Sequence, residues 1–482
     1  MKKTWIALLL VLCVPLTAFA SQNLLPEPEE YAENMLLGES SSDAIFEVTL
    51  YHAAADGLSL SPVSRILLVE GGRSPVEAVI EALLDPSGNP SQVSVAPSET
   101  KLLGYEWTGT LLTVNLSIDA ANTQTEQELL LLYAALANTL TSLEGVEAVN
   151  VLINGRHLPV QQLPVGVLRL GSSSITAAWA QFQADSDRFL SGEADAGSLT
   201  RECVVYFPSA DGRRLLPEIR TVEFSDANYA RTLLTAIRLG AEHSQITAEL
   251  PVEGEWLLED PAVRVNAAGE KLLSLTFSQE TLHEIVEQGI PLWQFLGAVT
   301  LTMCSFLPEL DGVQILQEGE ILKQLEIDGP TVQLSDGLLS RRLFSGYVGT
   351  RACVYLPMED GTLYAYEEAV APMEALSPRA LIETLLELAA LPDGLAPSDL
   401  LGVRVENGVA TVNLSANFYS ACQQLDEAGE RAVVYALVNT LCRLQGIVGV
   451  RLLIEGNAVE TLSQKIYLKT VLLPNPGISV TE

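Results

Sequence analysis

The sequence predicts a mixed α/β (α+β) protein of three tandem domains. Each has the element order β-β-α-β-β-α-β and forms a mixed sheet with two helices on one face. Two observations predict this fold class. The same succession of strand, turn and helix patterns occurs three times along the 482 residues. The tyrosines that mark each copy, Tyr51, Tyr206 and Tyr355, lie 155 and 149 residues apart, a period typical of separate domains and too long for a solenoid.

The opening strand of each unit ends in an Asp-Gly turn. It reads FEVTLYHAAADG from Phe46, CVVYFPSADG from Cys203 and ACVYLPMEDG from Ala352. Glycine tolerates the positive φ that such turns need, and aspartate bonds to the backbone just after itself. We therefore interpret the aspartates as turn residues, with a catalytic role as the alternative. The three are Asp56, Asp211 and Asp360.

An amphipathic helix follows each opening strand. In the first unit, Ser74 and Glu77 form a capping box with Pro75 at the first helical position. The apolar residues that follow recur at spacings of three and four, which predicts one buried face. The corresponding helices of the other two units begin at Tyr229 and Ser377.

A proline-containing loop, a hairpin, a second helix and a final strand complete each unit. The third copy, Gly408 to Gly456, is the most regular. Its strand Val409 to Leu414 is followed by a helix that we expect to begin at Glu430, and Gly446 ends that helix. The repeated landmarks are the loops at Pro97, Pro251 and Pro397; the strands LLTVNLS at Leu111, LLSLTFS at Leu272 and VATVNLS at Val409; the helix ends NTLTSL at Asn138, LTMCSF at Leu301 and NTLCRL at Asn439; and the final strands VNVLING at Val149, VQILQEG at Val313 and VRLLIEG at Val450.

These patterns divide the chain into eight segments. The two linkers carry serine, glycine and aspartate runs typical of exposed connections, and also short apolar pieces that leave packing on the neighbouring units open. The segments are 1–20, signal peptide; 21–44, acidic flexible leader; 45–160, first unit; 161–200, linker; 201–325, second and most divergent unit; 326–350, linker; 351–465, third unit; and 466–482, C-terminal tail.

The first twenty residues have the pattern of a secretion signal. Lys2 and Lys3 precede an apolar run, and Ala18-Phe19-Ala20 is an A-x-A cleavage site. We expect cleavage after Ala20. Lipidation of Cys13 and retention as an uncleaved anchor are the alternatives, and Leu12 before Cys13 disfavours the first. No later segment is apolar enough to span a membrane, so we expect a secreted or envelope protein whose mature chain is not inserted in a membrane.

The net charge of the chain indicates which classes of partner it can bind. The net charge is −34, and without the two lysines of the signal it becomes −36. Such a chain is repelled by nucleic-acid phosphates and by anionic lipid, which argues against nucleic acid as a ligand. It favours solubility and cationic partners. We interpret the acidity as solvation of the surface, with calcium or a cationic partner as the alternative.

The five cysteines of the mature chain do not form a dense disulfide framework, because the number is odd and the chain is long. We interpret them as small buried core residues. The pair Cys353 with Cys442 stays open as a disulfide. The others are Cys203, Cys304 and Cys422.

No pattern in the sequence points to catalysis, a cofactor or a metal. The four histidines, His52, His157, His243 and His283, do not recur between units and have no metal-ligand spacing. The S-x-x-K run from Ser98 to Lys101 is expected in a loop instead of at a helix start, which argues against a serine enzyme. Asn115 and Asn413 fit the glycosylation pattern, but we interpret them as strand-terminating polar residues, because both lie at the same strand end. We therefore predict no catalytic, cofactor-binding or metal-binding residues.

The repeated unit resembles the GerMN domain, the sporulation and spore germination domain of Gram-positive bacteria. The third unit resembles it through VATVNLSANF, ALVNTL and GVRLLIEG, and the first through LLTVNLS, ANTLTSLEGV and VNVLING. The second unit departs from the pattern: Thr276 replaces the asparagine of the strand, Leu301 stands in place of Asn138, and Pro308-Glu309 interrupts the glycine turn.

The resemblance implies an extracytoplasmic, non-enzymatic domain with a fold similar to ring-building modules. It implies a protein-interaction scaffold in sporulation or germination envelope assembly, with envelope or sporulation-complex proteins as partners, and it leaves self-association open. The alternatives are a binding module for cell-wall polymer and an accessory protein of envelope signalling. A wall hydrolase is a third and weaker alternative.

Overall fold

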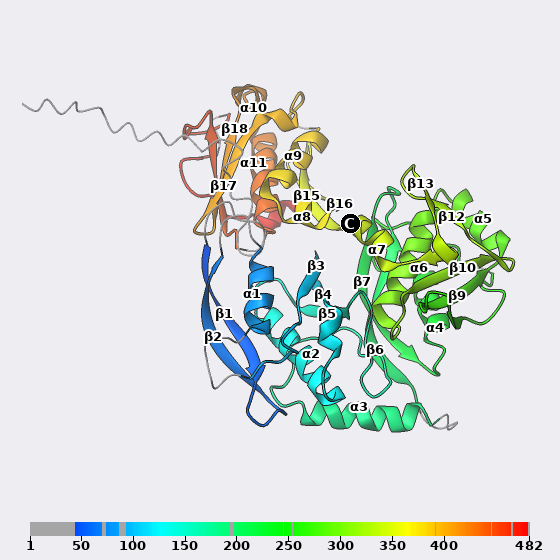
Figure 1. Ribbon diagram of the computed structural model, residues 1–482. Coiled ribbons are helices and arrows are strands. Elements are labelled where there is room, and N and C mark those ends of the chain that lie inside the picture. The colour runs from blue at the N-terminus through cyan, green and yellow to red at the C-terminus, as the bar shows by residue number, and fades with distance from the viewer. Residues whose placement is uncertain are drawn as a thin grey trace, which may run out of the picture.

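The protein is a mixed α/β molecule of small sheets and helices, which confirms the predicted fold class (Figure 1). The computed structural model describes residues 44–69, 74–85, 93–191, 197–243, 245–252, 254–390, 392–444, 446–463 and 466–480. The predicted signal peptide, the alternative lipid site Cys13 and all but the last residue of the predicted leader lie outside the described residues.

Unit 1 contains two sheets and two main helices. A Thr125 hydroxyl that accepts a hydrogen bond from the Glu128 N–H begins the second helix. The elements are β1 (Ala44–Ala53), β2 (Leu60–Val69), α1 (Pro75–Leu84), β3 (Leu102–Thr108), β4 (Leu111–Leu116), the 3₁₀ turn η2 (Ile118–Ala121), α2 (Glu126–Leu140) and β5 (Ala148–Ile153).

The single sheet that we expected in each unit is divided in two. β1 and β2 form an antiparallel hairpin, and β3, β4 and β5 form a mixed sheet, antiparallel and then parallel. Both helices pack on β1, and α2 also contacts β5. The reason for the division lies at the outer edge of β1, where the Tyr51 N–H donates to the Thr139 hydroxyl of α2. The helix there occupies a position that a further strand would need.

Unit 2 repeats this plan around a more deeply buried helix. All residues of α6 from Trp293 to Phe306 are buried, and α5 is an additional helix that we did not predict. The elements are β6 (Leu199–Pro208), β7 (Leu215–Phe224), α4 (Tyr229–Arg238), β8 (Ala262–Val265), β9 (Lys271–Phe277), α5 (Gln279–Glu287), α6 (Leu292–Phe306), β10 (Gly312–Gln317) and β11 (Glu320–Ile321).

Unit 3 confirms the strand, helix and strand predicted between Gly408 and Gly456. Its long helix begins at Glu427, after an Asp426 cap. The elements are β15 (Thr350–Pro357), β16 (Leu363–Val370), α8 (Pro372–Leu376), α9 (Pro378–Leu388), η5 (Pro397–Asp399), β17 (Leu400–Glu406), β18 (Val409–Leu414), α10 (Ala416–Cys422), α11 (Glu427–Leu441), β19 (Gly449–Ile454), η6 (Pro476–Ile478) and β20 (Ser479–Val480).

The segments that we expected as linkers and tail are folded. The first linker contains the helix α3 (Thr176–Phe189), and β20 of the predicted tail pairs with β16. The region after β11 contains β12 (Gln324–Glu326), β13 (Thr331–Gln333), η3 (Ser335–Gly337), β14 (Leu338–Leu339), α7 (Arg341–Phe344) and η4 (Ser345–Tyr347). The domain boundaries themselves stay a prediction.

After its final strand, the chain turns back along that strand in units 1 and 3. Val149 and Leu168 exchange two backbone hydrogen bonds of 2.8 Å, and Val450 and Leu472 exchange the same pair at 2.9 and 2.8 Å. We call these stretches, residues 163–173 and 467–479, the return segments. They bury apolar side chains, which explains why apolar pieces stand inside sequences that otherwise look like linkers.

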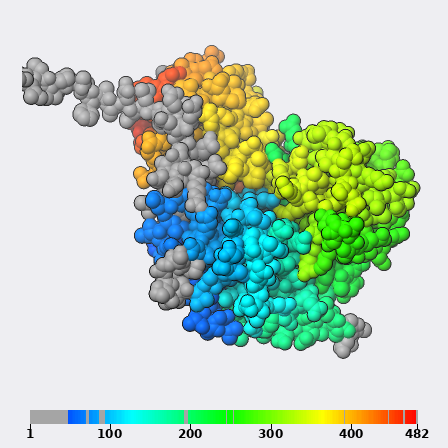
Figure 2. All heavy atoms as spheres, viewed as in Figure 1, coloured from blue at the N-terminus to red at the C-terminus, as the bar shows by residue number. Residues whose placement is uncertain are grey.

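Three hydrophobic cores fill the molecule, and one of them extends across two units. The core of unit 2 includes Leu111 and Ala148 of unit 1, and Leu163 of the return segment that follows unit 1. Units 1 and 2 are therefore continuous inside, while unit 3 has a core of its own and lies above them in the view of Figure 2. Within the described residues no single helix is long and apolar enough to span a membrane; the pair α5 and α6, bent by 116°, reaches that length and composition only together.

Candidate functional site

The threonine of the repeated helix end holds the landmark tyrosine of the opening strand. The Thr139 hydroxyl accepts a hydrogen bond of 3.0 Å from the Tyr51 N–H. The equivalent bonds measure 2.9 Å in both other units, from Tyr206 to Thr302 and from Tyr355 to Thr440. This contact occurs in all three units, including the divergent one, and ties each hairpin to its long helix.

The two asparagines of the strand motif are structural. The side-chain oxygen of Asn115 accepts a bond of 2.8 Å from the Gly155 N–H, and Asn413 accepts one of 2.7 Å from Gly456. Each bond joins the end of one strand to the turn after the neighbouring parallel strand. This geometry supports the strand-end interpretation over glycosylation, since Asn413 is also buried.

The asparagines of the helix ends hold the return segments. Asn138 accepts a bond of 2.8 Å from the Gly171 N–H, and Asn439 accepts one of 2.8 Å from Asn475 and donates one of 2.9 Å to its carbonyl. In unit 2 the equivalent residue is the fully buried Leu301. In unit 2 the Gln314 side chain holds the chain that follows the final strand, since it donates a hydrogen bond to the Asp336 carbonyl at 2.7 Å.

The three aspartates of the opening turns bond to the backbone within those turns. Asp56 accepts from the Leu58 N–H at 2.9 Å, Asp360 from Thr362 at 2.9 Å and Asp211 from Arg213 at 3.0 Å. The backbone N–H of Leu58, followed by the Ser59 hydroxyl, holds the pKa of Asp56 below its usual value. The glycine after each aspartate has a positive φ, between 63° and 84°. This confirms the turn interpretation.

The remaining residues that could carry chemistry are not brought together into a site. Ser98 is exposed in a turn and not at a helix start, in accord with the loop prediction. His52 and His157 are buried, and His283 lies on α5 beside Glu287. Within the part of the chain that the structure describes, no group of three or more His, Cys, Asp or Glu residues is placed to hold a metal ion.

The five described cysteines are free thiols, so the open pair Cys353 with Cys442 is not joined. Cys203, Cys304 and Cys422 are buried, as the core interpretation predicts. Burial raises the pKa of the Cys304 and Cys422 thiols to about 12, which suppresses the reactive thiolate. These side chains are therefore packing residues.

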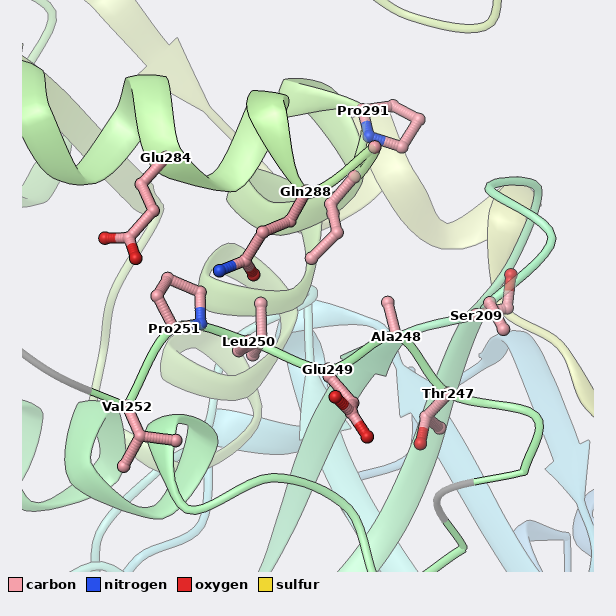
Figure 3. Close-up of a pocket in the computed structure, with 13 residues that line it drawn as sticks. Ser209, Thr247, Ala248, Glu249, Leu250, Pro251, Val252, Glu284, Gln288 and Pro291 are labelled. Atoms are coloured by element: carbon pink, nitrogen blue, oxygen red, sulfur yellow. The ribbon is translucent and has the colours of Figure 1, made fainter.

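A cavity of about 560 Å³ lies in unit 2, between the carboxyl end of α5 and the loop at residues 247–252 (Figure 3). Glu284 lines it from the helix and Gln288 from the position just after the helix, and Glu249 and Pro251 line it from the loop. Its lining contains two carboxylates and no histidine, cysteine, lysine or arginine. Such a cavity suits a cationic or amide-bearing group.

A second cavity, of about 210 Å³, lies where the three units meet. Gly109 comes from unit 1, Glu218 and His243 from unit 2, and Arg351 from unit 3. Glu218 accepts backbone bonds from Glu242 and His243 at 3.0 and 3.2 Å, and Arg220 pairs with it at 3.0 Å. These bonds all lie within unit 2 and hold the loop at residues 242–243 against β7.

Buried Arg341 connects units 1 and 2. It is 7% exposed, and its guanidinium donates to Glu106 of β3 at 2.6 Å, to Ser305 of α6 at 2.7 Å and to the Tyr206 hydroxyl at 3.2 Å. Burial works against the charge of Arg341, but the Glu106 carboxylate and Tyr206 more than offset it and raise its pKa. The guanidinium is thus a fixed cation between two units.

Sequence reasoning missed this arginine, because it lies in a segment that we expected to be an exposed linker. The signal was a basic pair, Arg341-Arg342, in a chain where acidic residues outnumber basic ones by 61 to 27. Its partner Glu106 stands in the middle of a strand pattern, where a charge needs a partner if it is buried.

A family model described as sporulation and spore germination (Germane) matches residues 49–159 and 353–460. Both stretches have the strands and helices of units 1 and 3, and neither includes residues 201–325. No curated protein matches the chain.

The chain is similar to several solved structures. The tandem GerMN domains of the sporulation protein GerM from Bacillus subtilis are 18% identical, with 59% of this chain and 100% of that one covered and a TM-score of 0.21. The first GerMN domain of the same protein is 18% identical over 27% and 96%, with a TM-score of 0.21. A putative lipoprotein from Clostridium perfringens is 22% identical over 25% and 80%, with a TM-score of 0.16.

Proposed function

The chain is a GerMN-domain protein of the sporulation and spore germination family, and from this premise we propose that it is a non-enzymatic scaffold outside the cytoplasm. In this role it binds envelope or sporulation-complex proteins during sporulation or germination. The match to the sporulation and spore germination family supports the proposed role in sporulation or germination. The N-terminal secretion pattern supports the location, and the net charge of −34 favours partners with basic surfaces.

One observation supports a scaffold over an enzyme. The polar residues that units 1 and 3 share are used inside the units: the threonines hold the opening strands, and the asparagines hold the turns and the return segments. What the units have in common is therefore their framework. A framework repeated with different outer surfaces suits binding of proteins, because each surface can contact a different partner.

The proposal is tested by crosslinking in sporulating cells. A tagged chain is expected to recover envelope proteins, and deletion of its gene is expected to impair sporulation or germination. The matched control is the same chain without residues 2–20, which stays in the cytoplasm and is expected to recover none of these proteins. Recovery of the same proteins by the control, or normal spores and germination after deletion, contradicts the proposal.

The proposed location has its own test. We expect the mature chain to begin at Ser21, since the A-x-A pattern ends at Ala20. Intact-mass measurement of the exported protein distinguishes this from a chain that begins at Cys13 with attached lipid. A full-length chain in the membrane fraction contradicts both and indicates an uncleaved anchor.

The cavity of unit 2 favours a second candidate function, a binding module for cell-wall polymer. Wall peptides present amide and ammonium groups, whose N–H groups can donate hydrogen bonds to the carboxylates of Glu249 and Glu284. Sedimentation with purified peptidoglycan tests this candidate. The double variant Glu249→Gln, Glu284→Gln is expected to stay in solution, and Glu287→Gln, an exposed residue of the same helix, is the control. The scaffold proposal predicts little sedimentation of any of these proteins.

A further inference from the structure

The return segment of unit 1 lies between units 1 and 2. Leu168 pairs with β5 of unit 1, and the Val167 N–H donates to the Glu202 carbonyl of β6 at 2.9 Å. Arg201 of β6 also donates to the Pro164 carbonyl, at 3.2 Å. Since β6 pairs with β7 along its other edge, the return segment covers the backbone edge that would otherwise be open to another strand.

His157 of unit 1 holds this segment in place. The residue is 1% exposed, and its imidazole Nε2 accepts a hydrogen bond of 3.1 Å from the Val165 N–H. The His157 backbone carbonyl accepts the Glu309 N–H of unit 2 at 2.8 Å. One residue therefore contacts both the return segment and the neighbouring unit. The Pro308-Glu309 pair, which interrupts the glycine turn of unit 2, lies at this contact.

Unit 3 has an alanine where unit 1 has this histidine. The backbone-bonded pairs Ile153–Arg156 and Ile454–Asn457 align the turns that follow β5 and β19. Ala458, which is exposed, therefore stands at the position of His157. The return segment of unit 3 has the same backbone pairing to its final strand without an imidazole to hold it. The histidine contact thus belongs to unit 1 and not to the framework that the units share.

The charged groups on the segments that meet at this junction are paired with one another. The ion pairs are Arg156 with Asp311, Lys271 with Glu309 and Arg169 with Glu202. On α2 the titratable group is Tyr133, whose hydroxyl donates to the Leu158 carbonyl at 3.1 Å. Within the described residues none of these groups bonds to the imidazole, and its Nδ1 has no hydrogen-bond partner. A positive charge on the ring therefore has no carboxylate bonded to it.

Protonation of the imidazole makes its contact with the return segment repulsive. The Nε2 that accepts the Val165 N–H becomes a donor, so two N–H groups face each other. Burial also disfavours the charge and lowers the pKa of His157 to about 4, an effect that the nearby Val151 backbone offsets only in part. Once the segment has moved away, water can reach the ring, which then takes up a proton near the ordinary histidine pKa of about 6.5.

We propose that His157 is an acid-sensitive latch on the return segment of unit 1. Protonation of its imidazole releases residues 163–169 from β6, while the rest of units 1 and 2 stays folded. Release uncovers the backbone edge at Glu202 and the core residue Leu163. A strand edge uncovered in this way is open to pairing with a segment of another chain. The inference goes beyond the proposed scaffold function and does not depend on it.

Hydrogen exchange of the mature chain, residues 21–482, tests the inference at pH 8 and pH 5. Each rate is divided by the rate of the unfolded chain at the same pH, and exchange detects the released form even where it is a small fraction of the protein. The released form binds the proton more tightly than the closed form does. Exchange within residues 163–169 is therefore expected to rise about thirtyfold at pH 5. The return segment of unit 3, residues 467–473, is expected to change less than about threefold, because Ala458 does not titrate.

The same measurement separates release of the segment from unfolding of unit 1. β4 lies inside the unit, so at pH 5 its amides are expected to exchange more slowly than residues 163–169. His157→Gln keeps an acceptor and cannot be charged, and it is expected to lose the pH response of this segment. His283→Gln, at an exposed imidazole of α5, is expected to respond as wild type does. The comparison of the two return segments in the wild-type chain needs no substitution and decides the matter should His157→Gln not fold.

Three results overturn the inference. The first is equal exchange of residues 163–169 at both pH values, or an equal rise in residues 467–473. The second is exchange of residues 163–169 at the same rate as β4 at pH 5, which would mean that the segment opens only when unit 1 unfolds. The third is an undiminished pH response in folded His157→Gln. None of these results bears on recovery of envelope proteins by crosslinking, so the proposed function can stand where this inference fails.

Discussion

In each unit, a threonine hydroxyl accepts the N–H of the landmark tyrosine at the outer edge of the opening hairpin, where a neighbouring strand would otherwise supply the acceptor. Thr302 is fully buried, and its oxygen is the acceptor for the Tyr206 N–H inside unit 2. We expect Thr302→Val, which keeps the shape and removes the acceptor, to lower the free energy of unfolding by about 1–3 kcal/mol. Urea denaturation measures this. Thr302→Ser keeps the oxygen and is the control; a valine variant as stable as the serine variant contradicts the assignment.

His157 makes the protein sensitive to acid. Burial lowers the pKa of this side chain to about 4, and its Nε2 accepts the Val165 N–H at 3.1 Å. An unfolded chain protonates histidine near pH 6.5. Stability is therefore full above pH 6.5 and falls as the pH drops toward 4, by about 3 kcal/mol in all, because only the unfolded state takes up the proton in that range.

Substitution isolates the share of His157 in this acid response. His157→Gln retains an acceptor and cannot be charged, so its unfolding free energy is expected to depend less on pH between 6.5 and 4. The control is His283→Gln, whose imidazole is 71% exposed on α5. Equal pH slopes for wild type and His157→Gln, measured by urea denaturation across this range, contradict the role of burial.

The return segments are the elements that separate units 1 and 3 from a bare strand–helix–strand motif. Asn439 holds the last one by a donated and an accepted bond to Asn475. Asn439→Leu copies the natural Leu301 of unit 2 but lacks the compensating Gln314. We expect faster proteolysis and hydrogen exchange within residues 466–480, and about 1–2 kcal/mol less stability. Asn439→Asp, which keeps one of the two bonds, is expected to be intermediate; unchanged protection of the segment contradicts this role.

The strands and helices that repeat could be predicted from the sequence because they occur in several copies. The connecting elements occur once, so the sequence analysis missed them. The strands and helix of Gly408 to Gly456 follow from periodicity, caps and turn glycines. The helix α3 was missed although Ile175, Trp179, Phe182 and Phe189 have helical spacing, because it occurs once and stands among serine and glycine. The division into two sheets could not be predicted either, since it depends on a side chain, Thr139, meeting a backbone N–H 88 residues away.

At the scale of the molecule, one ion pair joins Arg341 to Glu106, which lie 235 residues apart in the sequence. Arg341→Met leaves Glu106 without its cation, and we expect a loss of about 3 kcal/mol in urea denaturation. Arg341→Lys is expected to lose nearly as much, because one ammonium cannot bond Glu106 and Ser305 as the planar guanidinium does. Adding Glu106→Gln to Arg341→Met is expected to recover part of the loss.

The neighbouring Arg342 is exposed and supplies the control for these substitutions. Arg342→Met is expected to unfold as wild type does. A similar loss in both methionine variants would mean that charge in general, and not the buried contact, stabilises the junction.

The junction between units 1 and 2 also escaped sequence reasoning. Whether a unit end is covered depends on its neighbour, and a single sequence does not contain that information. The framework residues could be predicted because they repeat, whereas the contact of Arg169 with Glu202 belongs to this junction and not to the repeated pattern.

The core shared by units 1 and 2 has a consequence for synthesis. A chain leaves the ribosome amino end first and folds domain by domain. Leu111, Ala148 and Leu163 belong to the core of unit 2, and that core is complete only when Val348 has been made. For the time needed to translate about two hundred further residues, unit 1 therefore shows an apolar end to any chaperone or export factor nearby. A pause in translation before residue 348 should prolong that exposure, whereas a pause after it should not.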